Sequence, residues 1–320
     1  MDVSNASLYD GASAATEACA MAVNSVRRAR KILYSGTISP CTIAVLQTFF
    51  EHIDIELVEV SAPTGVLTIK DFNPHLSGSA AVLVQSPNRY GAIEDYTGFA
   101  EHIHESGTQF IIASNPVSLG ILKSPGEWGA DIAVGDGQSC GLAQNFGGPG
   151  VGFICATTRL MRKMLGRIVG QTTDVHSNRA FVLTLQAREQ HIKRERATSN
   201  ICTNQALAAL GMAVYLAAMG PEGIAEVARQ NHSKACYLRT RLISIPGVEL
   251  LHDHPFFNEF PIALPQSASE TVESMINEGY LAGVPLSDIE DGEDSALLVA
   301  VTEKRTRDEI DGFVDALGRI

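Results

Sequence analysis

The sequence predicts an α/β protein built on a mostly parallel β-sheet, followed by a smaller C-terminal α+β domain. Segments with the apolar content of buried strands alternate with helical segments over the first half of the chain, as a parallel sheet requires. After Pro246 the pattern changes to a smaller unit of alternating strands and helices. With 320 residues and 45% hydrophobic content, the chain can bury a core of this size.

The sheet-forming part is expected to begin with a helix. Residues 10–30 are rich in alanine, and such small side chains let a helix pack closely against a sheet. The segments that follow are identified by short apolar runs or by helical periodicity. Strands are expected over residues 31–35, 55–60, 81–85, 109–113, 131–134 and 151–156, and helices over residues 40–52 and 93–105.

Two further helices, over residues 204–219 and 222–243, are expected to lead away from the sheet. The apolar run 206–220 is shorter than the ~17–25 residues that cross a bilayer, so we interpret it as a core helix and expect no membrane contact. We expect a large domain over residues 1–220 and a small domain over residues 221–320. The small domain is expected to contain strands over residues 257–263 and 296–301 and helices over residues 269–277 and 306–317.

The composition narrows the classes of partner. The net charge of −12 and the pI near 5.2, without a basic stripe, argue against nucleic acid or an anionic membrane surface as the main partner. The first residues lack the basic and apolar regions of a signal peptide. The six cysteines include no C-x-x-C pair, so we expect reduced thiols in the cytoplasm rather than a disulfide or zinc framework.

Residues 129–156, GADIAVGDGQSCGLAQNFGGPGVGFICA, contain no lysine. They are expected to form a strand, a loop over residues 135–146 and a second strand. This segment resembles the strand-loop-strand of fold-type-I pyridoxal-phosphate (PLP) enzymes, whose loop carries the lysine that forms a Schiff base with the cofactor. When the glycine runs are superposed, Gln138 lies at or next to the place of that lysine. A side-chain amide cannot form an imine.

Three segments carry a more specific resemblance. They are RIVGQTTDVHSNRAFVLTLQAREQHIKRERATSNICTNQALAAL at residues 167–210, NASLYDGASAATEA at 5–18 and VTEKRTRDEIDGFV at 301–314. Together they resemble the glycine cleavage system P-protein, with the best match to its N-terminal half, which is the separate subunit 1 of two-chain forms. The likeness covers essentially the whole chain and implies a fold-type-I PLP-transferase-like fold.

The resemblance also implies a function. The family's enzyme is glycine dehydrogenase (aminomethyl-transferring, decarboxylating), an oxidoreductase of glycine catabolism that uses pyridoxal 5′-phosphate. It decarboxylates glycine and passes the aminomethyl group to the lipoyl group of H-protein. The lysine that holds the cofactor belongs to the second half or to subunit 2. We therefore expect a chain that is inactive alone, with subunit 2 and lipoylated H-protein as its partners.

The start of the chain is expected to be short relative to this family. Family members carry a long helical segment before the position that matches Met1, whereas residues 5–10 here read as the turn before the first helix. We therefore expect either a fragment or a start codon assigned too late.

Four residues near the first helix are candidates for contact with the cofactor phosphate. Free N–H groups and the helix dipole at a helix N-terminus suit a phosphate, and in fold-type-I enzymes this turn holds it. The alternative is capping of the helix by Asp10 or Ser13, and capping is favoured for the chain considered alone. The candidates are Asn5, Ser7, Gly11 and Ser13.

Asn115 follows the apolar run 110–113. An aspartate at the end of this strand normally keeps the cofactor's pyridinium nitrogen protonated, and the neutral asparagine cannot do so. The alternative, which is favoured, is a turn residue before Pro116. If the functional interpretation holds, Gln138 and Asn115 mark a degenerate site in which two requirements of the chemistry fail together.

The segment 188–196 carries four basic residues and two glutamates and is followed by Thr-Ser-Asn. A solvated charged face and simple helix capping are the plain interpretations. The resemblance favours a position at the mouth of a shared active site. The candidates for this shared cleft are Arg188, Arg196, Thr198, Ser199 and Asn200.

Other functions are less consistent with the sequence. The pairs His102/His104 and His252/His254 lack a further ligand pattern, so we expect no metal site. The glycine run at 147–152 opens a strand rather than a helix, which disfavours a dinucleotide site. A non-catalytic scaffold subunit remains the alternative. A self-sufficient PLP enzyme would need another lysine near the cleft, and Lys123 and Lys163 lie before and after the expected loop.

Overall fold

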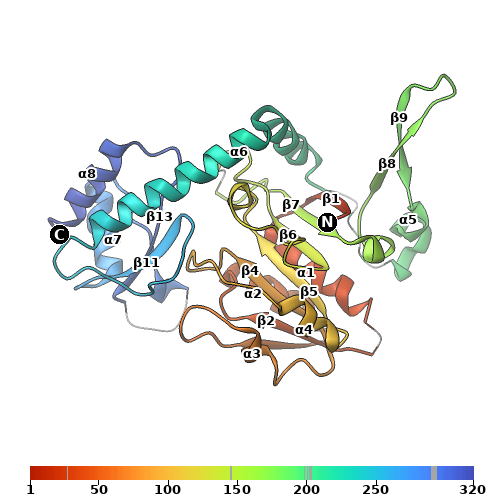
Figure 1. Ribbon diagram of the computed structural model, residues 1–320, viewed down its shortest axis with the longest axis horizontal. Helices are drawn as coiled ribbons and strands as arrows, with labels where there is room; N and C mark the ends of the chain where they lie inside the picture. Colours follow the sequence, from red (N-terminus) through yellow and green to blue (C-terminus); the bar gives the residue numbers. More distant parts are fainter. Residues whose placement is uncertain (27, 145, 198, 200, 202–203, 290–293) are drawn as a thin grey trace.

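The computed structural model describes residues 1–320 except residues 27, 145, 198, 200, 202–203 and 290–293 (Figure 1). Its centre is a seven-stranded sheet in the order β1-β7-β6-β5-β4-β2-β3. The five strands β2 to β6 are parallel, whereas β7 and β1 are antiparallel to their neighbours. The predicted mostly parallel sheet is therefore confirmed. The strands are β1 (Val3–Leu8), β2 (Lys31–Ser35), β3 (Glu56–Val60), β4 (Ser79–Ser86), β5 (Gln109–Ser114), β6 (Ile132–Asp136) and β7 (Gly152–Ala156).

Side chains of the central strands alternate between two cores, one on each face of the sheet. In β2, Ile32 packs with the first core and Leu33 with the second, and in β5 Ile111 and Ile112 divide in the same way. This follows from the two-residue period of a strand and explains the near-continuous apolar sequence of these strands. Helices cover both faces: α1 (Gly11–Val23) and α2 (Pro40–Phe50) pack in the first core, and α3 (Ile69–Phe72) and α4 (Phe99–Glu105) in the second.

Two predictions in this domain are wrong. Residues 5–10 do not form a turn, because residues 3–8 form β1, which pairs with β7 at the edge of the sheet. The sequence of β1 is largely polar, and its pairing is decided by the strand beside it. The helix predicted over residues 93–105 begins only at Phe99. The preceding residues are extended around Glu94, a buried side chain that accepts hydrogen bonds from Thr37, Asn88 and the Leu67 N–H. Burial raises the pKa of Glu94.

The long helix α6 (Ala206–Leu242) joins the central sheet to the C-terminal part (Figure 1). It bends at Gly220, which has a positive φ of 60° and precedes Pro221, so the predicted break between two helices is confirmed. The interpretation of residues 206–220 as a core helix is wrong, since Ala208 is the one buried residue there. By length and apolar composition alone α6 could cross a membrane, but one such helix is weak evidence for a span.

The C-terminal part has its own sheet and core. A four-stranded antiparallel sheet in the order β10-β11-β13-β12 packs with the second half of α6 and two further helices. This arrangement agrees with the predicted α+β unit, while the boundary between residues 220 and 221 stays a prediction. The elements are β10 (Glu249–Leu250), β11 (Glu259–Ala263), α7 (Ala268–Asn277), β12 (Val284–Pro285), β13 (Ala296–Ala300) and α8 (Arg307–Leu317).

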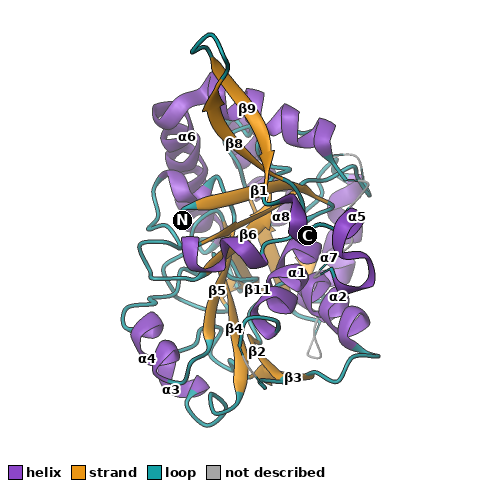
Figure 2. Ribbon diagram, turned by 90° about the vertical axis from the view of Figure 1, so that its right-hand side faces the viewer, coloured by secondary structure: helices purple, strands orange, loops and turns teal. Residues whose placement is uncertain are grey.

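A β-hairpin that was not predicted from the sequence projects from the body of the molecule (Figures 1 and 2). It consists of β8 (Ile168–Thr173) and β9 (Arg179–Thr184), and the short helix α5 (Gln190–Lys193) follows at its base. Asp174 closes the turn by accepting hydrogen bonds from the N–H groups of His176 and Asn178. The sequence signal for this hairpin was an aspartate turn between two segments with the composition of strands.

Candidate active-site cleft

A cavity of about 500 Å³ lies at the carboxyl ends of β4, β5 and β6. Ligands of open parallel sheets bind at this edge because the loops that follow the strands meet there. The cavity is bounded by the ends of these strands, by the loop after β6 and by the first residues of α1 and α2. Its lining residues are Asp10, Gly11, Ala12, Ser39, Cys41, Thr42, Gln85, Pro87, Ala113, Ser114, Asn115, Gly135, Asp136, Gln138 and Ser139.

Two carboxyl groups occupy the N-terminus of α1. Asp10 is the N-cap, and its Oδ1 accepts a hydrogen bond of 2.7 Å from the N–H of Ser13. Asp136, at the end of β6, accepts one of 3.0 Å from the N–H of Gly11. A bound phosphate would have to displace these acceptors and would meet their negative charge. The structure therefore gives the helix start a capping arrangement that opposes the binding of a phosphate.

Gln138 lies in the loop after β6 and lines the cavity. Its N–H donates to Oδ1 of Asp136 at 2.8 Å, and its side-chain amide donates to the carbonyl of Ala143 at 3.3 Å. No described residue of the cavity lining is a lysine. Lys123 lies over the ring of Trp128, and Lys163 donates to the carbonyl of Asn24, so neither lines the cavity.

Asn115 also lines the cavity, directly after β5. Its side-chain oxygen accepts a hydrogen bond of 3.0 Å from the N–H of Val117, which is the geometry of a turn at a strand end. The neighbouring Ser114 has a buried hydroxyl that makes no hydrogen bond. The fold thus brings together Gly11, Asn115 and Gln138 in the lining of one cavity.

The other residues proposed around the first helix lie elsewhere or are already used. Asn5 and Ser7 belong to β1 and do not line the cavity. The amide of Asn5 donates to the carbonyl of Leu165 at 2.6 Å, and neither residue lines the cavity. Ser13 is the residue whose N–H Asp10 caps. Of the four candidates only Gly11 lines the cavity, and the favoured alternative, capping by Asp10, is present; contact of these residues with a cofactor phosphate stays a prediction.

A second cavity, of about 320 Å³, lies at the base of the hairpin. Arg188 and Ser199 line it, and Ser199 donates a hydrogen bond of 2.6 Å to Glu17 of α1. Burial raises the pKa of Glu17 and lowers that of Arg188, although the neighbouring Glu189 opposes the second effect. Arg196 is exposed and does not line either cavity. Thr198 and Asn200 lie outside the described residues.

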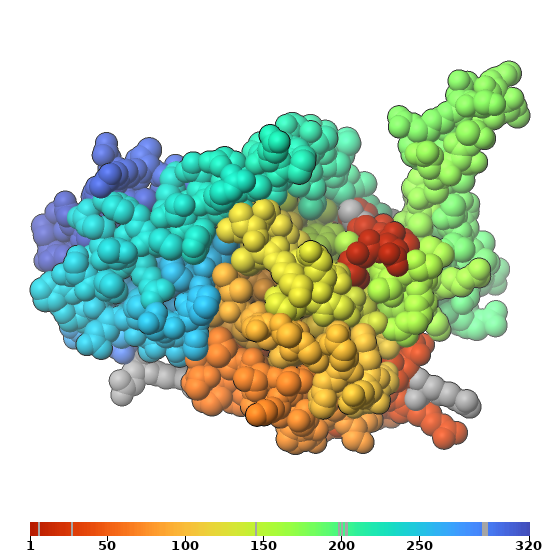
Figure 3. All heavy atoms as spheres, viewed as in Figure 1, coloured from red at the N-terminus to blue at the C-terminus, as the bar shows by residue number. Residues whose placement is uncertain are grey.

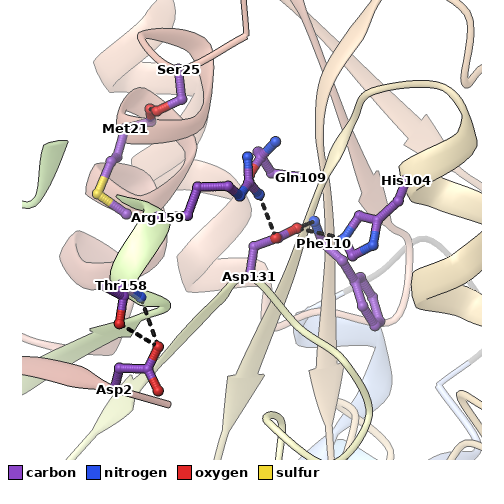
Figure 4. Close-up of polar contacts among 9 residues, drawn as sticks. All are labelled: Asp2, Met21, Ser25, His104, Gln109, Phe110, Asp131, Thr158 and Arg159. Carbon is purple, nitrogen blue, oxygen red and sulfur yellow. Dashed lines mark hydrogen bonds and ion pairs between the residues drawn. The ribbon is translucent and has the colours of Figure 1, made fainter. Parts of the chain in front are cut away.

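A cluster of polar side chains lies at the opposite end of the strands from the cavity (Figure 4). The buried Asp131, just before β6, accepts hydrogen bonds from Arg159 at 2.7 Å and from the N–H of Phe110 at 2.8 Å. Its second oxygen also lies 2.8 Å from Nε2 of His104. These contacts join two parallel strands to α4 and to the segment after β7. His104 is therefore partnered by a carboxyl group, and the described residues contain no group of three or more potential metal ligands.

The residues of the cavity do not fit covalently held pyridoxal phosphate. The cavity occupies the cofactor's usual edge of the sheet, yet its lining offers an amide at Gln138, an amide at Asn115 and two carboxyl groups at the helix start. The fold and the cleft together define a fold-type-I PLP-transferase-like chain without the residues that attach the cofactor.

Comparison with known proteins gives the particular family. The glycine cleavage system P-protein family matches residues 1–317, and the chain belongs to this family. A probable glycine dehydrogenase (decarboxylating) subunit 1 of Geotalea uraniireducens is 47% identical over 318 residues, which are 99% of this chain and 72% of that protein. The protein of the same description from Chlorobium luteolum is 47% identical over 322 residues, with 100% and 72% coverage.

Solved structures agree with this assignment. The crystal structure of glycine decarboxylase (P-protein) of the glycine cleavage system, in an inhibitor-bound form, aligns with a TM-score of 0.91 and 40% identity, covering 98% of this chain and 70% of that chain. A NifS-like protein from Rickettsia africae aligns with a TM-score of 0.70 at 14% identity, covering 99% and 81%. The second likeness shows the fold alone. The resemblance stated from the sequence is confirmed.

Proposed function

We propose that this chain is the subunit of glycine decarboxylase that lacks the cofactor lysine, and that it builds one part of an active site shared with a second P-protein subunit. Pyridoxal phosphate is held covalently by a lysine of that second subunit. When bound there, the cofactor withdraws electrons from the substrate. The assembled enzyme decarboxylates glycine and transfers the aminomethyl group to the lipoyl group of H-protein.

The observation that carries this proposal is the lysine-free lining of the large cleft. Gln138 offers no amine, and the helix start that would receive a phosphate is capped by Asp10 and Asp136. A chain of this family whose cleft lacks the cofactor lysine contributes to the reaction together with a partner chain that supplies the lysine. The described cysteines are free thiols, which supports the proposed cytoplasmic location.

We place the contribution of this chain at the base of the hairpin. Arg188 and Ser199 line the cavity there, and Ser199 donates a hydrogen bond to the half-buried Glu17. A guanidinium group is suited to binding and orienting a carboxylate. Arg188 and Ser199 face the shared cleft in the proposed assembly, and Arg196, Thr198 and Asn200 remain further candidates for it.

The exchange of the glycine carboxyl group with bicarbonate tests the proposal. We expect exchange when the chain is combined with a cognate subunit 2 and lipoylated H-protein, and none when this chain is omitted. The chain alone should also give no borohydride-reducible pyridoxyl adduct on a specific lysine. Exchange by this chain with H-protein alone would contradict the proposal.

A non-catalytic scaffold is the second candidate, because no reacting group has been assigned to this chain. Replacing Arg188 by Gln separates the two. A loss of exchange in a complex that still assembles indicates a contribution to the shared site. Full exchange would favour the scaffold. Arg162→Gln is the matched control, because Arg162 is exposed and lines neither cavity.

A further inference from the structure

The β8–β9 hairpin exposes an apolar strip on one of its faces. In the antiparallel register Val169 lies opposite Leu183, and Gln171 lies opposite Phe181. Residues two positions apart share a face of a strand, so Val169, Leu183 and Phe181 lie together. Their exposed fractions are 59%, 45% and 62%, which is unusual for three neighbouring large apolar side chains.

The hairpin gains little support from the rest of the chain. Figure 3 shows it standing clear of the body, and its two strands form a sheet of their own. A two-stranded sheet without a packed face is at best marginally stable in water. A surface that covers the strip would therefore stabilise the hairpin as well as bury apolar area.

Buried polar groups are left without partners at the base of the hairpin. Six buried side-chain polar atoms in the described part of the chain make no hydrogen bond, and three of them are Nε and Nη2 of Arg188 and Oε1 of Glu189. Buried polar atoms without a hydrogen-bond partner are rare in native proteins. Their concentration here indicates a region whose contacts are completed by another molecule.

The same region is basic in an acidic chain. Residues 159–196 contain nine of the chain's 24 lysines and arginines but three of its 36 aspartates and glutamates. Lys193, the last residue of α5, and Arg194, which follows it, are both exposed. This local charge favours a partner surface that carries carboxylates, because opposite charges steer association and fix orientation.

A second apolar strip lies at the start of α6. Leu207, Leu210 and Val214 are spaced three and four residues apart, so they share one face of the helix, and they are 83%, 59% and 60% exposed. The residue before this helix is anchored to β1 through a hydrogen bond from the N–H of Gln205 to the carbonyl of Ser7.

We infer that the β8–β9 hairpin is a docking arm for the partner subunit of the proposed decarboxylase. Its apolar strip inserts into a groove of that subunit, and Lys193 and Arg194 pair with carboxylates at the rim of the groove. The partner would also complete the contacts of Arg188 and Glu189 in the neighbouring cavity. This inference rests on the proposed function and identifies the surface through which the shared site is assembled.

The double change Phe181→Asp with Leu183→Asp tests the arm. It places two charges on the apolar strip, so we expect the affinity for subunit 2, measured by titration calorimetry, to fall at least about thirty-fold, as for central interface residues. Leu281→Asp is the matched control, since Leu281 is 86% exposed in the small domain and should leave the affinity unchanged. Circular dichroism of the isolated variants checks that the body remains folded.

A charge-reversal variant gives a second measurement that does not depend on the stability of the hairpin. Lys193→Glu with Arg194→Glu should slow association with subunit 2 and reduce the dependence of its rate on salt. Unchanged affinity in the apolar variant together with an unchanged association rate in the charge variant would overturn the inference. Wild-type chains that bind each other through the hairpin, and not subunit 2, would overturn it as well.

The failure of this inference is distinguishable from the failure of the proposed function. If both hairpin variants bind subunit 2 as the wild type does, and the complex exchanges glycine's carboxyl group, the docking arm alone is wrong. If the hairpin variants lose binding but the wild-type complex shows no exchange, the docking arm stands and the proposed function is wrong.

Discussion

At the scale of single residues, the cleft differs from a working pyridoxal-phosphate site in three separate ways. The Gln138 amide cannot form an imine, and Asp136 accepts a hydrogen bond from the Gly11 N–H at the start of α1. On our proposed placement of Asn115 at the pyridinium position, its neutral amide cannot keep the ring nitrogen protonated. Covalent attachment, electron withdrawal and phosphate binding are independent requirements. Restoring one of them leaves the others unmet.

We predict that Gln138→Lys alone does not create an active pyridoxal enzyme. The amine restores attachment, but Asn115 still leaves the ring nitrogen without an acidic partner. Losing one well-placed electrostatic group of this kind costs on the order of 10²–10³ in rate. The measurements are cofactor absorbance and exchange of the α-proton of glycine, compared with the double change Gln138→Lys with Asn115→Asp.

Substantial proton exchange by the single variant would mean that Asn115 does not lie at the pyridinium position. The degenerate site would then have to be placed elsewhere in the cleft. Ser139→Lys is the control, because Ser139 is the next residue and also lines the cavity.

At the scale of elements, the buried strands were the easiest to predict. Residues 32–34 and 110–113 are continuously apolar because each strand is covered on both faces, and the predicted bounds 31–35 and 109–113 agree closely with β2 and β5. β1 and the β8–β9 hairpin were missed because both contain many polar residues. Their strand structure depends on a neighbouring strand or on the turn at Asp174, which apolar periodicity does not reveal.

The N-cap of α1 gives a prediction at this scale. Asp10→Ala removes the acceptor of the Ser13 N–H, and we expect the free energy of unfolding to fall by about 1 kcal/mol. Urea denaturation followed by circular dichroism measures this change. Ser39→Ala is the control, because Ser39 is the N-cap of α2 and makes no capping hydrogen bond through its side chain. Equal losses in the two variants would contradict the assigned cap.

At the scale of the whole molecule, the large and C-terminal parts meet where the backbone at residue 91 closely approaches β11. Gly91 has a φ of +75°, and a Cβ atom built there would lie 1.9 Å from the carbonyl oxygen of Glu259 in β11. The adjacent Ala92 forms an isolated antiparallel bridge with Phe256, so the segment after β4 is connected to the segment before β11 at this point. Burial raises the pKa of Glu259.

We predict that Gly91→Ala destabilises the protein far more than Gly78→Ala. Both glycines have positive φ, so both changes carry the strain of a left-handed residue, on the order of 1 kcal/mol. The Cβ at residue 78 meets nothing within 4 Å, whereas the one at residue 91 forces β11 to move. Thermal unfolding of the two variants measures the difference. Equal melting temperatures would show that the two sheets can separate without cost at this contact.

The mostly parallel sheet, the family and the absence of a lysine from the loop after β6 could all be predicted from the amino-acid sequence. These features depend on local composition and on residue identity. The three-dimensional fold was needed to show that Gly11, Asn115 and Gln138 line one cavity, that Asp136 accepts a hydrogen bond from Gly11, and that Asn5 bonds to Leu165. The hydrogen bonds of Asp136 and Asn5 join residues more than a hundred positions apart, and their geometry is set by how the strands are ordered in the sheet rather than by any local pattern.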